Sequence, residues 1–307
     1  MIYTLTFNPA IDYIIRIGKL NWGETNRSES EEIQFGGKGI NVSTILANLG
    51  LETVALGFVA GFTGEELNRA VNERGIKTDF IRLSNGNTRI NIKLKCDAET
   101  EINAQGPEIT EKDIAKLYKK LKKIQNGDTL VLAGSVPSTL PQNIYEEIMS
   151  KLNGRGIRFV VDATGELLTS VLKYHPFLIK PNRAELEEIF ERKLDTDTKL
   201  AEAAKELQKQ GAVNVLVSLG GDGALLIDEF GRTHRRQAIP GKVVNTVGSG
   251  DSMVAGFLTG AERDYEYALA LGSAAGSATA FAPGLASKEE IMALCQNIER
   301  GNSYAYH

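Results

Sequence analysis

A glycine turn followed by an aspartate is the part of this sequence with the clearest potential for chemistry. The segment KVVNTVGSGDSMVAG (242–256) predicts a strand over 243–245, a turn formed by Gly248, Ser249 and Gly250, and a helix that begins near Asp251. Glycines allow consecutive backbone N–H groups to point in one direction, and the first helical turn adds unpaired donors and the positive end of its dipole. The segment therefore predicts an anion site.

Asp251 stands where an acidic residue is usually a helix cap. Here, however, its carboxylate would lie beside donors arranged for a phosphate, where a negative charge is unfavourable unless it accepts a proton from a nucleophile. That requirement fits the base of a phosphoryl transfer. Two other phosphate motifs are excluded by spacing, because G-x-G-x-x-G would need glycine where Met253 stands, and no G-x-x-x-x-G-K-[ST] occurs.

A second cluster, GGKGIN, precedes a predicted helix and could contact a ligand. Gly37 permits close approach, Lys38 supplies a cation, and Asn41 offers both a donor and an acceptor. A structural turn with a surface lysine is the alternative. Asp12, in NPAID, follows the first predicted strand, at the sheet edge where ligands of open α/β folds gather. It could equally be a turn residue.

Two further motifs follow predicted strands. In KPNRAE, Asn182 and Glu185 share one helix face, although Asn followed three residues later by Glu is also the signature of a capping box. In VSLGGDGALLI, Ser218, Gly220 and Gly223 could hold a nucleotide against exposed backbone, although a bare hairpin turn has the same pattern. Four glycine or polar clusters in one chain favour a binding function more strongly than any one of them.

The elements that must position these clusters alternate along the chain. Short apolar runs alternate with segments of helical period, which predicts a mostly parallel, buried sheet covered by helices. The predicted strands are 2–7, 53–58, 129–133, 158–162, 177–180 and 214–219, and the predicted helices are 39–49, 64–74, 111–124, 141–153, 183–190 and 198–210. The fold class is therefore α/β.

Two segments, about 11–35 and 87–106, alternate polar and apolar residues without a helix between strands, and they look antiparallel. Nothing resembles a linker, so we expect a single domain over 1–307 with a small sheet as a lid. A net charge of −4 argues against nucleic acid or anionic lipid as partners. The uncharged stretch 267–287 is rich in Ala, Gly and Ser, which favours a buried helix over a membrane span.

Two further features bear on the location of the protein. Cys96 and Cys295 lie far apart without metal-ligand spacing, which favours a reducing, cytoplasmic setting. The N-terminal sequence MIYTLTFNPAID lacks a basic region and a continuous apolar run, so it does not read as a secretory signal.

Taken together, the motifs resemble those of the ribokinase-like, or PfkB, carbohydrate kinases over essentially the whole chain. In family order they are NPAID (8–12), GGKGIN (36–41), TRIN (88–91), GSVP (134–137), KPNRAE (180–185), SLGGDGA (218–224) and NTVGSGDSM (245–253). The last motif is the most specific, although its turn reads GSGD where GAGD is commoner. The resemblance implies a three-layer α/β fold with a small antiparallel β lid.

The resemblance also implies a role for each site residue. Asp251 would be the catalytic base, and the turn over 248–250 would donate to the transferring phosphoryl group from ATP. Asn182 would help to bind the nucleotide and Glu185 the Mg²⁺, commonly through water. The nucleotide would also contact Ser218, Gly220 and Gly223. The sugar phosphate would contact Asp12, Gly37, Lys38, Asn41 and Arg89, with Arg27 a weaker candidate.

Within the family, TLTFNPAID, TRINIKL and VNTVGSGDSMVAG look most like the 1-phosphofructokinases. We therefore expect conversion of fructose 1-phosphate to fructose 1,6-bisphosphate. The alternatives are a kinase for tagatose 6-phosphate or fructose 6-phosphate and, from another class, a sugar-phosphate sensor without activity. Alternating apolar residues of the lid, among them Ile14, Ile33, Ile90 and Ile92, together with the family resemblance, predict a homodimer that packs lid against lid.

Overall fold

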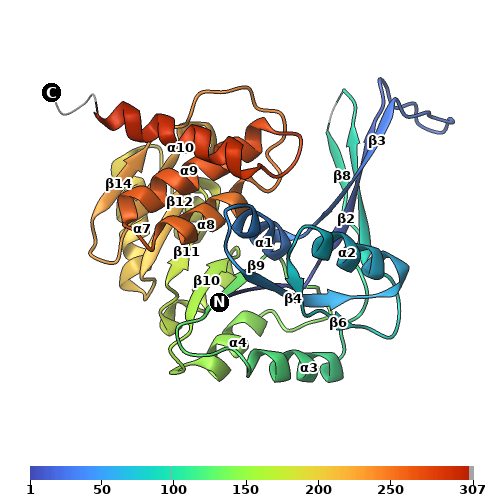
Figure 1. Ribbon diagram of the computed structural model, residues 1–307, viewed down its shortest axis with the longest axis horizontal. Coiled ribbons are helices and arrows are strands. Elements are labelled where there is room, and N and C mark those ends of the chain that lie inside the picture. The colour runs from blue at the N-terminus through green and yellow to red at the C-terminus, as the bar shows by residue number, and fades with distance from the viewer. Residues whose placement is uncertain (98, 304–307) are drawn as a thin grey trace.

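The computed structural model describes residues 1–97 and 99–303, with a ten-stranded sheet at its centre (Figure 1). From β12 to β5 the paired strands are parallel, and the last two strands, β13 and β14, pair antiparallel at the edge. In spatial order the strands are β14 (Thr233–Arg236), β13 (Ala224–Ile227), β12 (Asn214–Ser218), β11 (Leu178–Ile179), β10 (Arg158–Asp162), β9 (Thr129–Ala133), β1 (Ile2–Thr6), β4 (Thr53–Val59) and β5 (Lys77–Thr78), with β6 (Ile81–Arg82) also on β4.

Helices cover both faces of this sheet. The helices are α1 (Lys38–Asn48), α2 (Gly61–Glu73), α3 (Glu111–Leu121), α4 (Ile144–Leu152), α5 (Glu166–Thr169), α6 (Arg183–Phe190), α7 (Asp197–Lys209), α8 (Ser249–Gly260), α9 (Tyr265–Phe281) and α10 (Lys288–Ser303), with short 3₁₀ turns η1 (Leu172–Tyr174) and η2 (Gly220–Asp222). The six strands and six helices predicted from the alternating pattern between 2 and 219 are all present, with bounds that differ by a few residues. The α/β prediction is thus confirmed.

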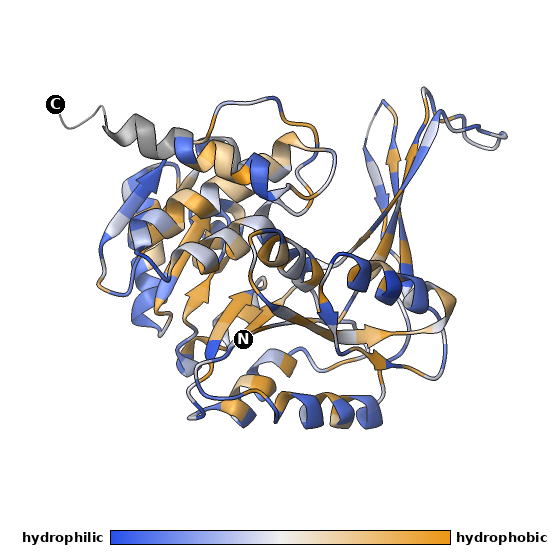
Figure 2. Cartoon of the chain, in the orientation of Figure 1, coloured by the Kyte–Doolittle hydropathy of each residue, from blue (hydrophilic) through white to orange (hydrophobic). Residues whose placement is uncertain are grey.

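Alternate residues of each central strand serve opposite layers. In β9, Leu130 and Leu132 pack in a core with α3, α4 and α7, whereas Val131 packs in a second core with α1, α8 and α9. All five residues of this strand are buried, because both faces of the sheet are covered. Figure 2 shows the central strands as largely hydrophobic, with hydrophilic colours on the outer helices.

The lid is a separate four-stranded sheet that projects beside the main body (Figure 1). Its order is β3 (Ser30–Gly36), β2 (Ala10–Arg16), β7 (Arg89–Lys95) and β8 (Thr100–Ile102). Each predicted segment forms an antiparallel hairpin, as expected, but the hairpins meet through a parallel pair, β2 with β7. The lid is therefore mixed rather than wholly antiparallel.

One face of the lid carries a row of apolar side chains. Tyr13 is directly opposite Ile33 on one side and Ile92 on the other, and Ile92 is opposite Ile102. Ile33 is 56% exposed and Ile102 is 60% exposed. Ile14 does not belong to this row, because it is paired with Glu32 and Lys93, is buried, and points to the opposite face.

Two expectations about the C-terminal third have different outcomes. The predicted strand over 243–245 is wrong, since the amides of Val244 and Asn245 donate to Ala280 O at the end of α9 rather than to a strand. Of the uncharged stretch 267–287, residues 267–281 lie in α9, most of whose residues are buried, and 282–287 follow the helix. Across the described residues, no helix combines the length and apolar character that a membrane crossing requires.

Candidate active site

Polar and charged side chains gather where the parallel strands end. Asp162 is the last residue of β10, Lys180 directly follows β11, and Ser218 is the last residue of β12. The helices α1 and α8 begin at the same edge, and they contact one another. Carboxyl ends of parallel strands are where open α/β folds place their ligands, so the fold brings the motifs together at the expected edge.

The glycine turn begins α8 with Gly248 as its N-cap residue, in the left-handed region at φ 81. A Cβ at this position would also lie 2.6 Å from Leu285 Cδ2, so the turn requires glycine. No side chain caps the helix. The Oγ of Ser249 is buried without a hydrogen-bond partner and borders the same cavity as Gly250. The turn thus leaves donors available for a ligand.

Asp251 lies in the first turn of α8 and is 5% exposed. Its Oδ2 accepts a hydrogen bond from Asn41 Nδ2 at 2.8 Å. The interpretation of Asp251 as a helix cap is not supported, because the N-cap position belongs to Gly248. Burial raises the pKa of the Asp251 carboxyl from its ordinary value of 3.8 to about 6, and the negative charge of Asp162 acts in the same direction. The carboxyl is therefore suited to proton transfer near neutral pH.

Two charged residues that the sequence analysis did not select meet beside Asp251. Asp162 is 1% exposed, and its Oδ1 lies 3.4 Å from Lys180 Nζ and 3.3 Å from Lys38 Nζ. A charged residue at the end of an apolar strand could have been noticed in the sequence as a candidate for a buried ion pair, since such groups are rarely buried unless paired. Lys180 is the first residue of the KPNRAE motif, which was recognised, but its partner Asp162 lies on another strand, β10.

Asn182 and Glu185 form the capping box that was the structural alternative. Asn182 Oδ1 accepts from the Glu185 amide at 2.9 Å, and Glu185 Oε2 accepts from the Asn182 amide at 2.8 Å. The two residues begin α6 beside the turn predicted to bind the nucleotide, since Asn182 also bridges to Ser218. The negative charge of Glu185 contributes to raising the pKa of Lys38, so the two side chains interact electrostatically. The capping box is thus established, and a role for Glu185 toward a metal stays a prediction.

A cavity of about 780 Å³ lies between the predicted nucleotide-binding turn and the glycine turn. Ser218, Gly220 and Gly223 line one side, and Ser249 and Gly250 line the other. The prediction that these motifs share one binding surface is consistent with this arrangement. The cavity is lined also by Asn182 and by small residues of α9, including Gly276 and Ala280.

Two smaller cavities lie on the lid side. One, of about 400 Å³, is lined by Asp12 and Asn41. Asp12 is held from within the lid, because Asn91 Nδ2 donates to its Oδ1 at 2.8 Å. The other, of about 290 Å³, is lined by Lys38 and Arg89, and by Gly37, Asn8 and Ser135. Two of the three cations predicted for a sugar phosphate, Lys38 and Arg89, thus border one cavity.

Arg89 and Arg27 have different positions in the lid. The Arg89 guanidinium donates to the carbonyl of Asn8 at 3.0 Å and to that of Ala104 at 3.3 Å, and its Nε is buried without a partner. Arg27 lies exposed in the connection between β2 and β3 and lines neither lid-side cavity. The single chain therefore brings Arg89, but not Arg27, to the other site residues.

Asp251 lies between the two sides of this site. Its neighbour Gly250 lines the cavity of about 780 Å³, which is the predicted nucleotide side, and its hydrogen-bond partner Asn41 lines a lid-side cavity. A buried carboxyl with a raised pKa at this point can accept a proton from a hydroxyl group on one side while a helix N-terminus binds an anion on the other.

Comparison with known proteins agrees with this geometry. The chain is 42% identical over 301 residues to a 1-phosphofructokinase of Bacillus subtilis (strain 168), with 97% of this chain and 99% of the relative covered. It is 39% identical over 295 residues to a D-tagatose-1-phosphate kinase of Bacillus licheniformis, with 95% and 96% covered.

A solved structure of phosphofructokinase-2 from Escherichia coli in complex with substrates and products is also similar. Its TM-score is 0.92 at 29% identity, and 97% of this chain and 99% of that chain are covered. The family model described as pfkB family carbohydrate kinase matches residues 5–292. The chain therefore belongs to the pfkB family of carbohydrate kinases and is a sugar kinase.

Proposed function

We propose that the protein transfers the γ-phosphoryl group of ATP to the C6 hydroxyl of fructose 1-phosphate, with Asp251 as the base. The observation that carries this proposal is the buried Asp251 between the two sides of the site, with its pKa raised to about 6 by burial. In the reaction, the proton of the C6 hydroxyl passes to the Asp251 carboxylate as the bond from O6 to the γ-phosphorus forms. The bond from that phosphorus to the β,γ-bridging oxygen breaks, and ADP leaves.

The protonation state of Asp251 suits this role. With a pKa of about 6, the carboxyl is mostly ionised at neutral pH and can accept a proton, yet it is more basic than an ordinary aspartate. Asn41 donates to the ionised oxygen and orients it. A sugar-phosphate sensor without activity would gain nothing from a buried carboxylate next to an anion site. The position of Asp251 therefore favours a kinase over a sensor.

The lid-side cavities are lined by groups that suit a phosphorylated sugar. Lys38 and Arg89 border the cavity of about 290 Å³ and offer two cationic groups for the phosphate already present on the substrate. Asn8 and Ser135, which the sequence analysis did not select, line the same cavity and supply further polar groups. Asp12, held by Asn91, is available to a sugar hydroxyl.

The nucleotide-side cavity fits ATP. Its volume of about 780 Å³ is within the usual range for small-molecule and cofactor sites. It presents the unpartnered Ser249 Oγ and the first turn of α8 to the phosphates. Asn182, Ser218, Gly220 and Gly223 line its other side.

Magnesium fits this donor set only as an ion carried by the phosphates of ATP. Among residues 1–97 and 99–303 there is no group of three or more His, Cys, Asp or Glu side chains placed to hold a metal. Mg²⁺ usually keeps several waters and binds through one or two carboxylates together with substrate phosphates. We assign Glu185 to it, through water. When bound, Mg²⁺ neutralises charge on the phosphates.

The choice of sugar is tested by steady-state kinetics with ATP and Mg²⁺. Fructose 1-phosphate, fructose 6-phosphate, tagatose 6-phosphate and tagatose 1-phosphate are compared, the last because a relative is a D-tagatose-1-phosphate kinase. We expect kcat/KM to be highest for fructose 1-phosphate. A higher value for any of the other three would make that sugar the substrate, and no turnover with any of them would overturn the proposed activity.

We also propose that the protein is a cytoplasmic homodimer with its contact through the lid. The row formed by Tyr13, Ile33, Ile92 and Ile102 is apolar, and two of its side chains are more than half exposed. A second copy of the same face would cover it, since a twofold contact brings identical apolar rows together. A solved structure of Escherichia coli phosphofructokinase-2 is described as a tetrameric inhibited form, so assembly occurs in the family.

A further inference from the structure

One buried carboxylate gathers two ammonium groups at the centre of the site. Lys38 is the first residue of α1, and Lys180 directly follows β11, so the two lysines come from different parts of the chain. Both Nζ atoms approach the same oxygen, Oδ1 of Asp162, at 3.3 and 3.4 Å. We call Asp162, Lys38 and Lys180 the lysine clamp.

The charges within the lysine clamp are interdependent. Burial alone would raise the pKa of the Asp162 carboxyl, but the two ammonium groups lower it below its ordinary value. Burial alone would lower the pKa of Lys38, but Asp162 and then Asp251 more than offset this. Lys180 is only 5% exposed, and a buried ammonium is costly without a counter-charge. Asp162 therefore supplies a counter-charge to both lysines and holds them in place.

The two lysines lie toward opposite sides of the site. Lys38 lines the cavity of about 290 Å³ that it shares with Arg89. Lys180 lies against the glycine turn, because a Cβ on Gly250 would be 3.2 Å from its Nζ, and Gly250 lines the nucleotide-side cavity. One carboxylate thus fixes a cation on each side of Asp251. Two ammonium groups against one carboxylate leave the lysine clamp with a net positive charge, which offsets the ionised Asp251 carboxylate beside it.

We propose that Asp162 is a positioning residue for phosphoryl transfer, which holds Lys38 on the sugar side and Lys180 on the nucleotide side of Asp251. This inference rests on the proposed function. Asp162 has a second effect, because its negative charge makes Asp251 a stronger base. The charged groups that act on Asp251 are Asp162 from β10, Lys38 from α1 and Lys180 from the end of β11; the lysines oppose the effect of the aspartate.

The first test is Asp162→Asn, which keeps the shape of the side chain and removes its charge. Without the clamp, both lysines lose their fixed positions, and kcat should fall about 100-fold, the usual effect of misplacing groups around a reacting centre. Without the negative charge, Asp251 should become a weaker base, and the pH at which kcat is half-maximal on the acid side should move down. Loss of packing alone would not move that midpoint.

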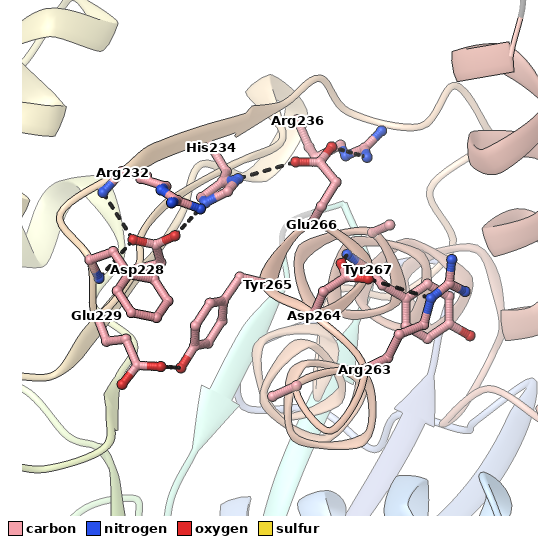
Figure 3. A pocket seen from close by; sticks show the side chains of 13 residues that line it. Asp228, Glu229, Arg232, His234, Arg236, Arg263, Asp264, Tyr265, Glu266 and Tyr267 are labelled. Atoms are coloured by element: carbon pink, nitrogen blue, oxygen red, sulfur yellow. Dashed lines mark hydrogen bonds and ion pairs between the residues drawn. The ribbon is translucent and has the colours of Figure 1, made fainter.

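A matched control is Asp228→Asn, in the charged cavity shown in Figure 3. Asp228 is also 1% exposed and follows β13 of the same sheet. It accepts hydrogen bonds from the amides of Phe230 and Arg232 and pairs with His234 Nε2 at 2.8 Å. This cavity lies outside the machinery described above. The control variant should lose stability, while its kcat stays within about twofold of the wild type and its acid midpoint does not move.

A second readout needs no substrate. Carbon-13 NMR of labelled aspartate carboxyls, with the Asp251 signal assigned by its absence in Asp251→Asn, reports the Asp251 midpoint directly. It should be about 6 in the wild type and lower in Asp162→Asn. Lys180→Met removes a positive charge instead and should raise it. The opposite signs separate the lysine clamp from general disruption, and Lys180→Met decides the matter if Asp162→Asn does not fold.

An Asp251 midpoint unchanged in the folded variants, or a kcat of Asp162→Asn within about twofold of the wild type, would overturn the lysine clamp. If the midpoints move as expected but the wild-type protein phosphorylates no sugar phosphate, the proposed function fails and the electrostatic coupling between Asp162 and Asp251 remains. The two failures are therefore distinguishable.

Discussion

Asn41 donates a hydrogen bond from Nδ2 to Oδ2 of Asp251 at 2.8 Å, joining residues 210 positions apart in the chain. The bond connects the first turns of α1 and α8, the two helices that begin at the carboxyl edge of the sheet. Because it favours the ionised carboxylate, this bond opposes the effect of burial on the Asp251 pKa. Asn41 therefore limits how far that pKa rises.

Asn41→Ala should shift the pH dependence of the enzyme. Loss of the hydrogen bond removes stabilisation of the ionised form, so the Asp251 pKa should rise above its value of about 6. Since the base acts in its ionised form, the acid limb of the kcat profile should move to higher pH. A profile of kcat against pH for both proteins measures this, and a shift to lower pH would show that Asn41 does not stabilise the carboxylate.

Asp251→Asn should make the folded protein more stable at mildly alkaline pH. The folded pKa of about 6 lies above the ordinary value of 3.8, so the folded state binds the proton more tightly than the unfolded state does. The ionised carboxylate then costs the wild type roughly 3 kcal/mol above both pKa values, and nothing below them. The stability gained by the variant should therefore grow as pH rises from 3.8 to about 6 and stay constant above.

Urea unfolding of the wild type and Asp251→Asn across this pH range measures the difference. A variant less stable than the wild type at mildly alkaline pH would mean that the carboxylate is stabilised in the fold rather than strained by burial. Such a result would remove the physical basis for a raised pKa.

Arg89→Ala should weaken binding of the sugar phosphate and leave the nucleotide unaffected. A charge-assisted hydrogen bond to a phosphate is worth roughly 1.5–3 kcal/mol, so KM for the sugar phosphate should rise about 10- to 150-fold. Arg82→Ala is the control, because Arg82 is exposed and lies on β6 away from the cavities described. Equal increases in both KM values would show that Arg89 mainly supports the lid through Asn8 and Ala104.

Ile33→Glu should separate the proposed dimer. The side chain lies in the apolar row and is 56% exposed in the single chain, so a charge there would face the same charge on the second copy. Light scattering should give twice the 33.4 kDa chain mass for the wild type and the chain mass for the variant. Phe230→Glu, at an exposed aromatic outside the lid, should remain dimeric. A wild-type monomer with full kinase activity would exclude the dimer from this account.

The main sheet could be predicted because its signals are local. Runs such as TLVLA in β9 and RFVVD in β10 are apolar over consecutive residues, which is typical of strands covered on both faces. The glycine turn before Asp251 was recognised for the same reason. The predicted strand over 243–245 failed because its β-branched residues resemble a strand, whereas their amides pair with the end of α9.

The features that could not be predicted depend on contacts between distant segments. The parallel pairing of β2 with β7 joins hairpins that are far apart in the chain, and no local pattern encodes its direction. The lysine clamp likewise joins the end of β10 to α1 and to the residue after β11. Asn182 and Glu185 fitted two interpretations, a ligand site and a capping box, and the hydrogen bonds between them establish the capping box.

The most direct test of the central claim is the turnover of Asp251→Asn with fructose 1-phosphate, ATP and Mg²⁺. Its control is Asp264→Asn, because Asp264 is a true helix cap that accepts a hydrogen bond from the Tyr267 amide. Loss of a general base should lower kcat about 100- to 10,000-fold with ATP binding retained, whereas the cap variant should keep its turnover. If Asp251→Asn instead retains more than about a third of the wild-type kcat, Asp251 is not the base and the proposed mechanism is wrong.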